Sequence, residues 1–182
     1  IAELIATQNI IECARETGAK VHICHVSHPK VAQAIKEAQL DGVDVTAETC
    51  GHYLSMTDKD VLAHGSLFKC APPLRSAEDV DALWHYVEDG TLSCIGSDHS
   101  PCELSEKSEE KHGIFGAWGG ISSIQSTIQA AYSEGVVKRG ISPTVIAHAI
   151  GEGPARVFGL YGKKGAIRPG FDADMVILDP DA

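Results

Sequence analysis

The chain contains the segment Leu92-Ser-Cys-Ile-Gly-Ser-Asp-His-Ser-Pro-Cys102. Its first half is an apolar run of strand length, and its second half opens a polar loop. The carboxylate of Asp98 and the imidazole of His99 therefore stand side by side where a buried strand is expected to reach the surface. When strands and helices alternate in a barrel, catalytic groups lie at this position, at the C-terminal ends of the strands. The alternative is a turn that only ends the strand, because Asp and Ser favour turns by bonding their own backbone.

A second candidate, His25, ends another short β-rich run at residues 20–26. A single histidine in such a run is more often a satisfied core residue than a ligand, and His22 points to the opposite face of the predicted strand. His25 and Asp98, however, both end strands of one alternating set. Imidazole plus carboxylate is the ligand chemistry of a hydrolytic metal site. A metal there lowers the pKa of bound water towards neutrality, and Asp98 could both bind the metal and accept a proton from that water.

The composition is that of an ordinary globular protein. The chain has 182 residues, enough for one domain with a core, of which 43% are hydrophobic and 22% charged. Its formal net charge of -10 argues against nucleic acid and anionic membrane surfaces as partners. The six cysteines form no Cys-x-x-Cys pair and several lie in apolar runs, so we expect free thiols and a cytoplasmic protein. No apolar run approaches membrane-spanning length.

Both ends of the sequence suggest a piece of a longer enzyme. It begins with Ile1 rather than Met, and a helix is predicted from its first residues. It stops at Ala182, just after an expected strand. The N-terminus carries no signal-peptide pattern.

Hydrophobic periodicity predicts strands that alternate with helices. Helices are expected at 2–17, 29–40, 58–63 and 76–88, and strands at 20–26, 43–49 and 92–98. Such alternation implies parallel strands with right-handed crossovers. Three such units cannot close an eight-stranded barrel, but they fit the second half of one.

The rest of the chain is less regular. Residues 103–111 are nearly all charged or Ser, which predicts a solvated loop or, alternatively, a mobile flap over a site. A helix is expected over about 121–134, and another from Pro143 that the glycines and proline at 151–154 should end. Residues 167–178 are typical of a turn followed by a strand.

Five motifs, in this order, resemble those of the cyclic amidohydrolases. They are Val21-His-Ile-Cys-His-Val-Ser27, Glu48-Thr-Cys-Gly-His-Tyr-Leu54, Lys69-Cys-Ala-Pro-Pro-Leu-Arg75, Ser97-Asp-His-Ser-Pro-Cys102 and Ala117-Trp-Gly-Gly-Ile121. This family includes dihydroorotase, hydantoinase, dihydropyrimidinase and allantoinase. The resemblance covers nearly the whole chain and is greatest to the allantoinase branch.

The resemblance implies a distorted (β/α)8 TIM-like barrel with two metal ions, usually zinc, in each full-length subunit. Residues 1–160 would form the C-terminal half of this barrel, and residues 161–182 would return to a small β-domain. In the family the ligands are a His-x-His, a bridging carboxylated lysine, two further histidines and an aspartate. Here His25 matches the last histidine, and Asp98 matches the aspartate that binds metal and acts as the general base. The other ligands have no counterpart in this sequence.

The resemblance also implies contacts around the metals. Ala71 and the backbone near Gly119 and Gly120 match the segments whose amides and carbonyls hold the cyclic amide. His52 and His99 are expected beside the metal ligands rather than on the metal. His99 could alternatively cap a helix or have a purely structural role.

The expected reaction is the metal-dependent opening of allantoin to allantoate, a step of purine breakdown. Dihydroorotases have a histidine four positions after the aspartate, where this chain has Cys102, and a thiol cannot replace an imidazolium that faces a carboxylate. Hydantoinases and dihydropyrimidinases usually lack the Asp-His-Ser-Pro-Cys pattern and have Gln at the position of His52. The chain departs from the family pattern at two places: Gly51 stands for a proline, and residues 151–153 stand for an Asn-containing turn.

Alternatives therefore remain open. The enzymatic alternative is hydantoinase, dihydropyrimidinase or dihydroorotase activity, and the non-enzymatic alternative is a metal-free scaffold homologue. In either enzymatic case the substrate is a small cyclic ureide or amide. We expect neither nucleic acid nor a membrane as a partner. The family resemblance implies a homotetramer.

Overall fold

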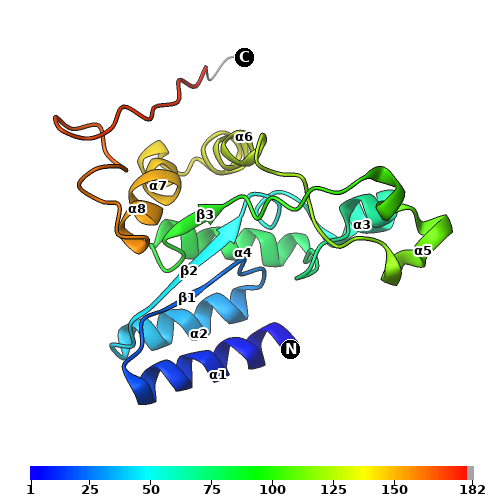
Figure 1. Cartoon of the computed structure of the whole chain (residues 1–182), viewed down its shortest axis with the longest axis horizontal. Coiled ribbons are helices and arrows are strands. Elements are labelled where there is room, and N and C mark those ends of the chain that lie inside the picture. Colours follow the sequence, from blue (N-terminus) through cyan, green and yellow to red (C-terminus); the bar gives the residue numbers. More distant parts are fainter. Residues whose placement is uncertain (180–182) are drawn as a thin grey trace.

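The computed structural model describes residues 1–179 and contains a parallel three-stranded sheet with helices between the strands (Figure 1). β1 (Val21–Ile23) pairs with β2 (Val45–Cys50), and β2 pairs with β3 (Cys94–Gly96). All pairings are parallel. The predicted alternation of strand and helix is confirmed, and the three strands reach the same edge of the sheet with their C-terminal ends.

The first four helices form where the sequence predicts them. They are α1 (Ala2–Thr17), α2 (Pro29–Leu40), α3 (Asp58–His64) and α4 (Ala77–Glu88), with the short 3-10 helix η1 (Gly65–Phe68) after α3. Local signals set their ends. Ser76 accepts a hydrogen bond from the backbone N–H of Asp79, and Thr57 forms a capping box with Asp60. Gly18 ends α1 in the left-handed conformation, with φ 69°.

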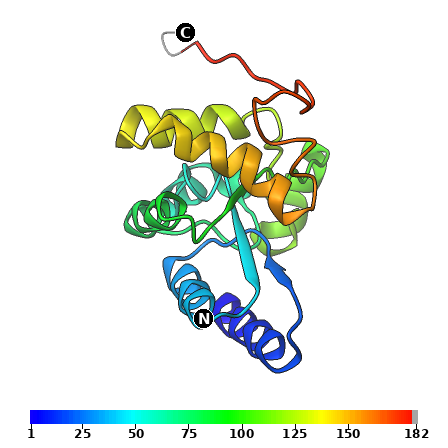
Figure 2. The ribbon, with the colours of Figure 1, turned by 90° about the vertical axis from the view of Figure 1, so that its left-hand side faces the viewer.

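The two faces of the sheet differ in burial. Val45, Ala47 and Thr49 of β2 are buried, whereas Thr46 and Glu48 are half-buried, as strand alternation requires. Helices α1 and α2 lie on one side of the molecule and α6 to α8 on the other, with the sheet between them (Figure 2). Trp84 of α4 is 1% exposed, and its indole N–H donates to the carbonyl oxygen of Leu54 at 3.0 Å, which satisfies its polar atom inside the core.

The prediction of a loop at 103–111 is wrong. The segment contains the 3-10 helix η2 (Leu104–Lys107) and the start of α5 (Glu109–Gly116), which kinks at Gly113. The ammonium group of Lys107 donates to the carbonyl oxygens of Leu67, Lys69 and Gly120. Long-range hydrogen bonds of this kind cannot be predicted from hydrophobic periodicity, because the segment consists mostly of charged residues.

The helix expected over 121–134 begins later and continues further. α6 (Thr127–Ala131) passes into a π-helical segment, η3 (Tyr132–Lys138). The start is delayed because Ile121 pairs with His99 in an isolated bridge and the hydroxyl of Ser123 donates to Ser97. These contacts hold residues 121–123 against the end of β3.

The glycines at 151 and 153 do not end the next helix, contrary to the prediction. α7 (Pro143–Ala147) continues through the π-helical η4 (His148–Glu152) into α8 (Gly153–Val157). Gly153 lies directly against the backbone oxygen of Ser93, where a Cβ atom would overlap that oxygen. The glycine therefore permits close packing of this helix on the chain that leads into β3.

The strand expected at 167–178 is also not observed among the described residues. The turn forms, with the N–H of Phe171 donating to Arg168 at 3.1 Å, but the following residues extend away without strand pairing (Figure 1). Ile177 is 97% exposed. A strand needs a partner strand for its backbone groups, and no strand within residues 1–179 pairs with this segment, although the N–H of Asp172 donates to Lys163 at 2.7 Å. Residues 180–182 of the expected return segment lie outside the described residues.

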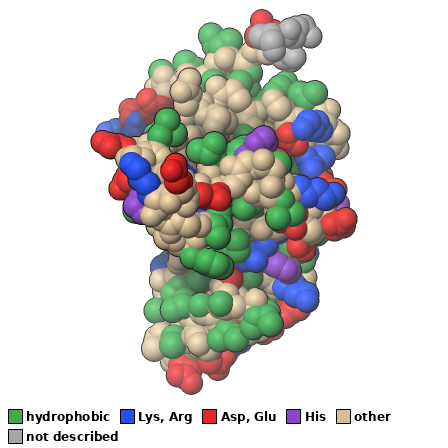
Figure 3. Space-filling model, turned by 90° about the vertical axis from the view of Figure 1, so that its right-hand side faces the viewer, with side chains coloured by type: hydrophobic (Ala, Val, Ile, Leu, Met, Phe, Trp, Pro, Cys, Tyr) green, Lys and Arg blue, Asp and Glu red, His purple; other side chains and the backbone are tan. Residues whose placement is uncertain are grey.

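Several large apolar side chains are exposed, among them Leu62, Leu104 and Phe115. The space-filling view shows hydrophobic side chains between charged ones on the face that includes α3 and α5 (Figure 3). In the described part of the chain, no helix has both the length and the apolar character needed to cross a bilayer.

The contact between Gly153 and Ser93 gives a stability prediction. Gly153→Ala is expected to lower the free energy of unfolding by about 1–3 kcal/mol, because a Cβ atom must displace either the helix or the backbone of Ser93. The matched control is Gly151→Ala, where a Cβ meets nothing within 4 Å and the substitution should be neutral or stabilising by up to about 1 kcal/mol. Urea unfolding of the full-length variants measures both, and equal stabilities would contradict the packing argument.

Candidate functional site

His25 and Asp98 occupy matching positions at the ends of two strands. Each lies two residues after its strand, β1 and β3 respectively. Their φ angles are 45° and 43°, and among residues 1–179 they are the only non-glycine residues with positive φ. Residues other than glycine rarely adopt this left-handed backbone conformation, because it is strained. Residues with such backbone strain cluster at functional sites. The matching geometry therefore marks both residues as a candidate site.

His52 occupies the same position on the middle strand, two residues after the end of β2. It is 3% exposed, and burial lowers its pKa to about 4. The charge of Asp98 opposes this shift and the charge of His25 adds to it, so both residues act on the same imidazole. Three adjacent parallel strands thus bring the three side chains to one edge of the sheet.

Cys50, the last residue of β2, joins this group and was missed by sequence reasoning. One ligand atom each of Cys50, His52 and Asp98 lies within 4.8 Å of the others. Burial raises the pKa of the Cys50 thiol, and the carboxylates of Asp98 and Glu48 raise it further. The available signal was its position directly after the strand predicted at 43–49, beside the Gly-His turn.

The residues present fit a metal ion. Nδ1 of His25 and both ring nitrogens of His52 are buried without a hydrogen-bond partner. Buried polar atoms are rarely left unpaired, so these nitrogens indicate a missing group. Imidazole nitrogen, carboxylate oxygen and thiolate sulfur are the ligands of zinc-type cations. The predicted ligands His25 and Asp98 would hold such an ion, with His52 and Cys50 within reach.

The structure brings together the residues expected to hold a substrate. A Cβ atom at Gly119 would lie 3.9 Å from Cβ of Ala71, and the N–H of Gly120 donates to Lys69 at 3.0 Å. The hydroxyl of Tyr53, next to His52, donates to the carbonyl oxygen of Pro72 at 2.8 Å. The segment with Ala71 is thereby tied to the turn that carries His52.

His99 has a structural contact. Its Nδ1 accepts hydrogen bonds from the backbone N–H groups of Ser123 at 3.1 Å and Ile124 at 3.2 Å. This contact is of the structural kind given as the alternative, and it ties residues 123 and 124 to the chain after β3.

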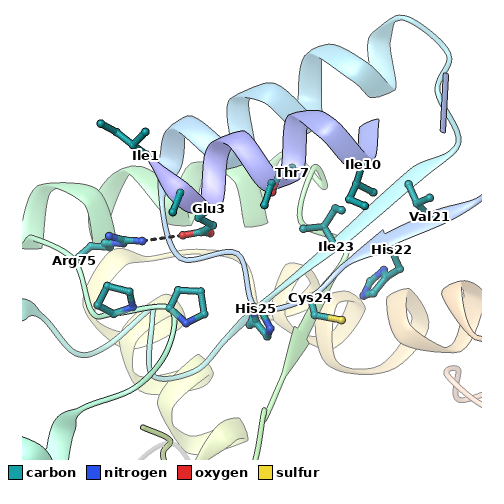
Figure 4. Close-up of a pocket in the computed structure, with 14 residues that line it drawn as sticks. Ile1, Glu3, Thr7, Ile10, Val21, His22, Ile23, Cys24, His25 and Arg75 are labelled. Atoms are coloured by element: carbon teal, nitrogen blue, oxygen red, sulfur yellow. Dashed lines mark hydrogen bonds and ion pairs between the residues drawn. The ribbon is translucent and has the colours of Figure 1, made fainter. Parts of the chain in front are cut away.

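His25 also lines a cavity of about 820 Å³ between α1, β1 and the segment from Pro72 to Arg75 (Figure 4). At its rim, the carboxylate of Glu3 accepts hydrogen bonds from the backbone N–H of Ser27 at 2.9 Å and from its hydroxyl at 2.6 Å. Arg75 donates to Glu3 at 2.8 Å and to the Ser27 hydroxyl at 3.1 Å. This Glu3–Ser27–Arg75 cluster holds the backbone two residues after His25.

A comparison with family models identifies the chain. The model of the amidohydrolase family matches residues 5–182. The chain belongs to the amidohydrolase family. The predicted fold, part of a TIM-type barrel with parallel strands, is confirmed for this amidohydrolase chain by its likeness to solved members.

Similar proteins of known sequence include two named allantoinase. The one from Rubrobacter xylanophilus is 44% identical over 180 residues and the one from Enterococcus faecalis is 42% identical over 180 residues; each alignment covers 99% of this chain and 39% of the relative. The chain therefore spans about two fifths of the length of these relatives.

Solved structures show the same fold at lower identity. The L-hydantoinase (dihydropyrimidinase) from Arthrobacter aurescens aligns with a TM-score of 0.88 and 32% identity, over 92% of this chain and 37% of that chain. The dihydropyrimidinase from Brevibacillus agri aligns with a TM-score of 0.86 and 30% identity, over 92% of this chain and 37% of that chain.

The Glu3–Ser27–Arg75 cluster predicts a coupling between α1 and His25. Glu3 and Arg75 have side chains only 16% and 21% exposed. Glu3→Gln should lower the free energy of unfolding by about 1.5–3 kcal/mol, the contribution of hydrogen bonds to a charged group. It should also weaken metal retention by about 10- to 100-fold, as for other residues that orient a ligand.

Glu12→Gln on the same helix is the matched control for this prediction. Glu12 is 63% exposed and pairs with Arg15 at 3.5 Å, so its loss should cost less than about 0.5 kcal/mol. Urea unfolding and metal competition titrations of the full-length protein measure both variants. A Glu3→Gln protein that behaves like Glu12→Gln would show that the cluster does not hold the His25 turn.

Proposed function

We propose that the full-length protein containing this chain is a metal-dependent hydrolase that opens the ring of allantoin to give allantoate. Relatives named allantoinase are 36–44% identical over 99–100% of the chain, which supports this substrate. The observation that carries the chemistry is the edge of the sheet, where His25, His52 and Asp98 follow three adjacent parallel strands at the same offset.

Hydrolysis of a cyclic amide needs a nucleophilic water, a polarised carbonyl and a proton for the departing nitrogen. A divalent metal, which we take to be zinc, lowers the pKa of water and polarises a carbonyl when bound at such a site. His25 and Asp98 contribute two of its ligands. Asp98, which is exposed at the strand end, accepts the proton from the attacking water and returns it to the ring nitrogen as the C–N bond breaks.

The neighbouring residues set the environment of that reaction. His52 stays neutral near pH 7, since burial lowers its pKa to about 4, and its unpaired nitrogens face the same region. The backbone at Ala71, Gly119 and Gly120 binds the amide groups of the ring. Cys102 is half-buried after β3, and a thiol at this position suits a ureide ring that carries no carboxylate.

The rest of the proposal concerns the whole protein. β1 and β3 are the outer strands of the described sheet, and a closed barrel would pair both of their free edges. Residues 1–160 then belong to the barrel, and residues 161–182 lead to a small β-domain. The six cysteines are free thiols, which favours the cytoplasm. We expect two metals per subunit and a homotetramer.

Substitution of the two ligands tests the proposal. His25→Ala and Asp98→Asn should each reduce allantoin turnover by the full-length protein about 100- to 10,000-fold, because a ligand or the proton acceptor is lost. His85→Ala is the control, since this α4 side chain is 78% exposed and lies outside the site. Metal content is measured in the same preparations. Near-normal turnover in either ligand variant would refute the assignment.

The choice of ring is tested with allantoin, hydantoin, dihydrouracil and dihydroorotate side by side. A preference for hydantoin or dihydrouracil would keep the mechanism and replace the substrate, in line with the solved hydantoinases that share the fold. An absence of both metal and turnover would favour the scaffold alternative.

A further inference from the structure

A second group of ligand-type side chains lies on β1 and β2, apart from the strand-end site. His22, Cys24 and Glu48 each offer a ligand atom, and these atoms lie within 4.8 Å of one another. His22 is opposite Thr46 in the β1–β2 register. Figure 4 shows His22 and Cys24 on the side of β1 away from Ile10 of α1, so the group faces away from the helix that packs on this strand.

The contacts of His22 leave one ring nitrogen without a partner. Its Nδ1 lies 2.8 Å from the hydroxyl of Thr46, and that hydroxyl lies 3.4 Å from the carbonyl oxygen of Val21. The contact with Thr46 orients the imidazole ring. A histidine that binds a metal through one nitrogen is held in this way through the other.

The remaining nitrogen faces a carboxylate. Nε2 of His22 is buried without a hydrogen-bond partner and lies 3.4 Å from Oε2 of Glu48. Both atoms are therefore available to a third group. A cation between them would be bound by both.

The surroundings leave space for a cation beside Glu48. Glu48 lies over Gly96 of β3, where a Cβ atom would come within 3.1 Å of its Oε1, so the glycine leaves room for the carboxylate. The ring of Phe158 packs edge-on to His22, with centroids 5.7 Å apart, and covers this side. The thiol of Cys24 supplies a third donor. Burial raises the pKa of this thiol, and the negative charges of Glu48 and Asp98 raise it further. A divalent cation bound to the three side chains would offset the negative charge gathered here.

We propose that His22, Cys24 and Glu48 bind a divalent transition-metal cation at a site separate from the one at His25 and Asp98. One nitrogen, one sulfur and one oxygen donor suit zinc or cobalt rather than magnesium or calcium, which prefer oxygen ligands alone. Binding displaces the thiol proton of Cys24 to solvent and forms a metal–thiolate bond. The site is independent of the proposed hydrolytic activity.

Cobalt(II) binding to the metal-depleted full-length protein tests this site, because a cobalt–thiolate bond gives a near-ultraviolet charge-transfer absorption that nitrogen and oxygen ligands do not give. The wild-type protein and the control Cys13→Ser, at an exposed thiol of α1, should show the band. Cys24→Ser should remove the part of the band that Cys50→Ser leaves. His22→Gln and Glu48→Gln should each lower the bound cobalt by one equivalent per chain.

Two further variants separate this site from the first one. Cys50→Ser should keep the band, because Cys50 belongs to the strand-end group. Asp98→Asn should keep it as well, even where turnover is lost. No band in the wild-type protein, or a band that Cys50→Ser removes and Cys24→Ser keeps, would overturn the proposal. The first of these results would leave His22 and Glu48 as a side-chain pair that holds no metal.

Discussion

Parallel hydrogen bonding between β1, β2 and β3 is the constraint on which the rest of the structure depends. Parallel strands in register deliver their C-terminal ends to one edge of the sheet. Because His25, His52 and Asp98 each follow a strand by two residues, this pairing alone brings them together from positions far apart in the sequence. In open and closed α/β sheets the carboxyl edge is where binding and catalysis occur.

The site requires local geometry that the chain would not adopt on its own. His25 and Asp98 have positive φ, a conformation that costs about 1–3 kcal/mol at a non-glycine residue. Contacts nearby compensate for it. Glu3 and Arg75 hold Ser27 after His25, and His99 binds two backbone N–H groups after Asp98. Helix α1 and the chain beyond β3 therefore support the site without contributing a ligand to it.

Local sequence signals predicted the first half of the chain well. Helix caps such as Ser76 and the Asp41-Gly42 turn act within a few residues, and apolar periodicity separates strands from helices. The predictions for the second half were wrong where contacts between segments distant in the sequence determine the backbone conformation. Lys107 binds three carbonyl groups from two other segments, and Gly153 permits a helix to cross Ser93. Neither contact has a pattern in the local sequence.

The candidate site was predictable to a similar extent. His25 and Asp98 could be proposed because they end predicted strands and match family motifs. Cys50 could not be singled out, since a buried cysteine in an apolar run is indistinguishable from a core residue until its distance to Asp98 is known. The position of Glu48 depends on Gly96 of the neighbouring strand, whose missing side chain leaves space for the carboxylate, and only the packed structure reveals that contact.

The most direct test of the central claim is anomalous X-ray diffraction, at the absorption edge of the bound metal, from crystals of the full-length protein. The account predicts an anomalous peak about 2.0–2.2 Å from a ring nitrogen of His25 and from a carboxylate oxygen of Asp98, as expected for zinc. A fully loaded metal centre that contacts neither residue would contradict the claim that these strand ends form the metal site.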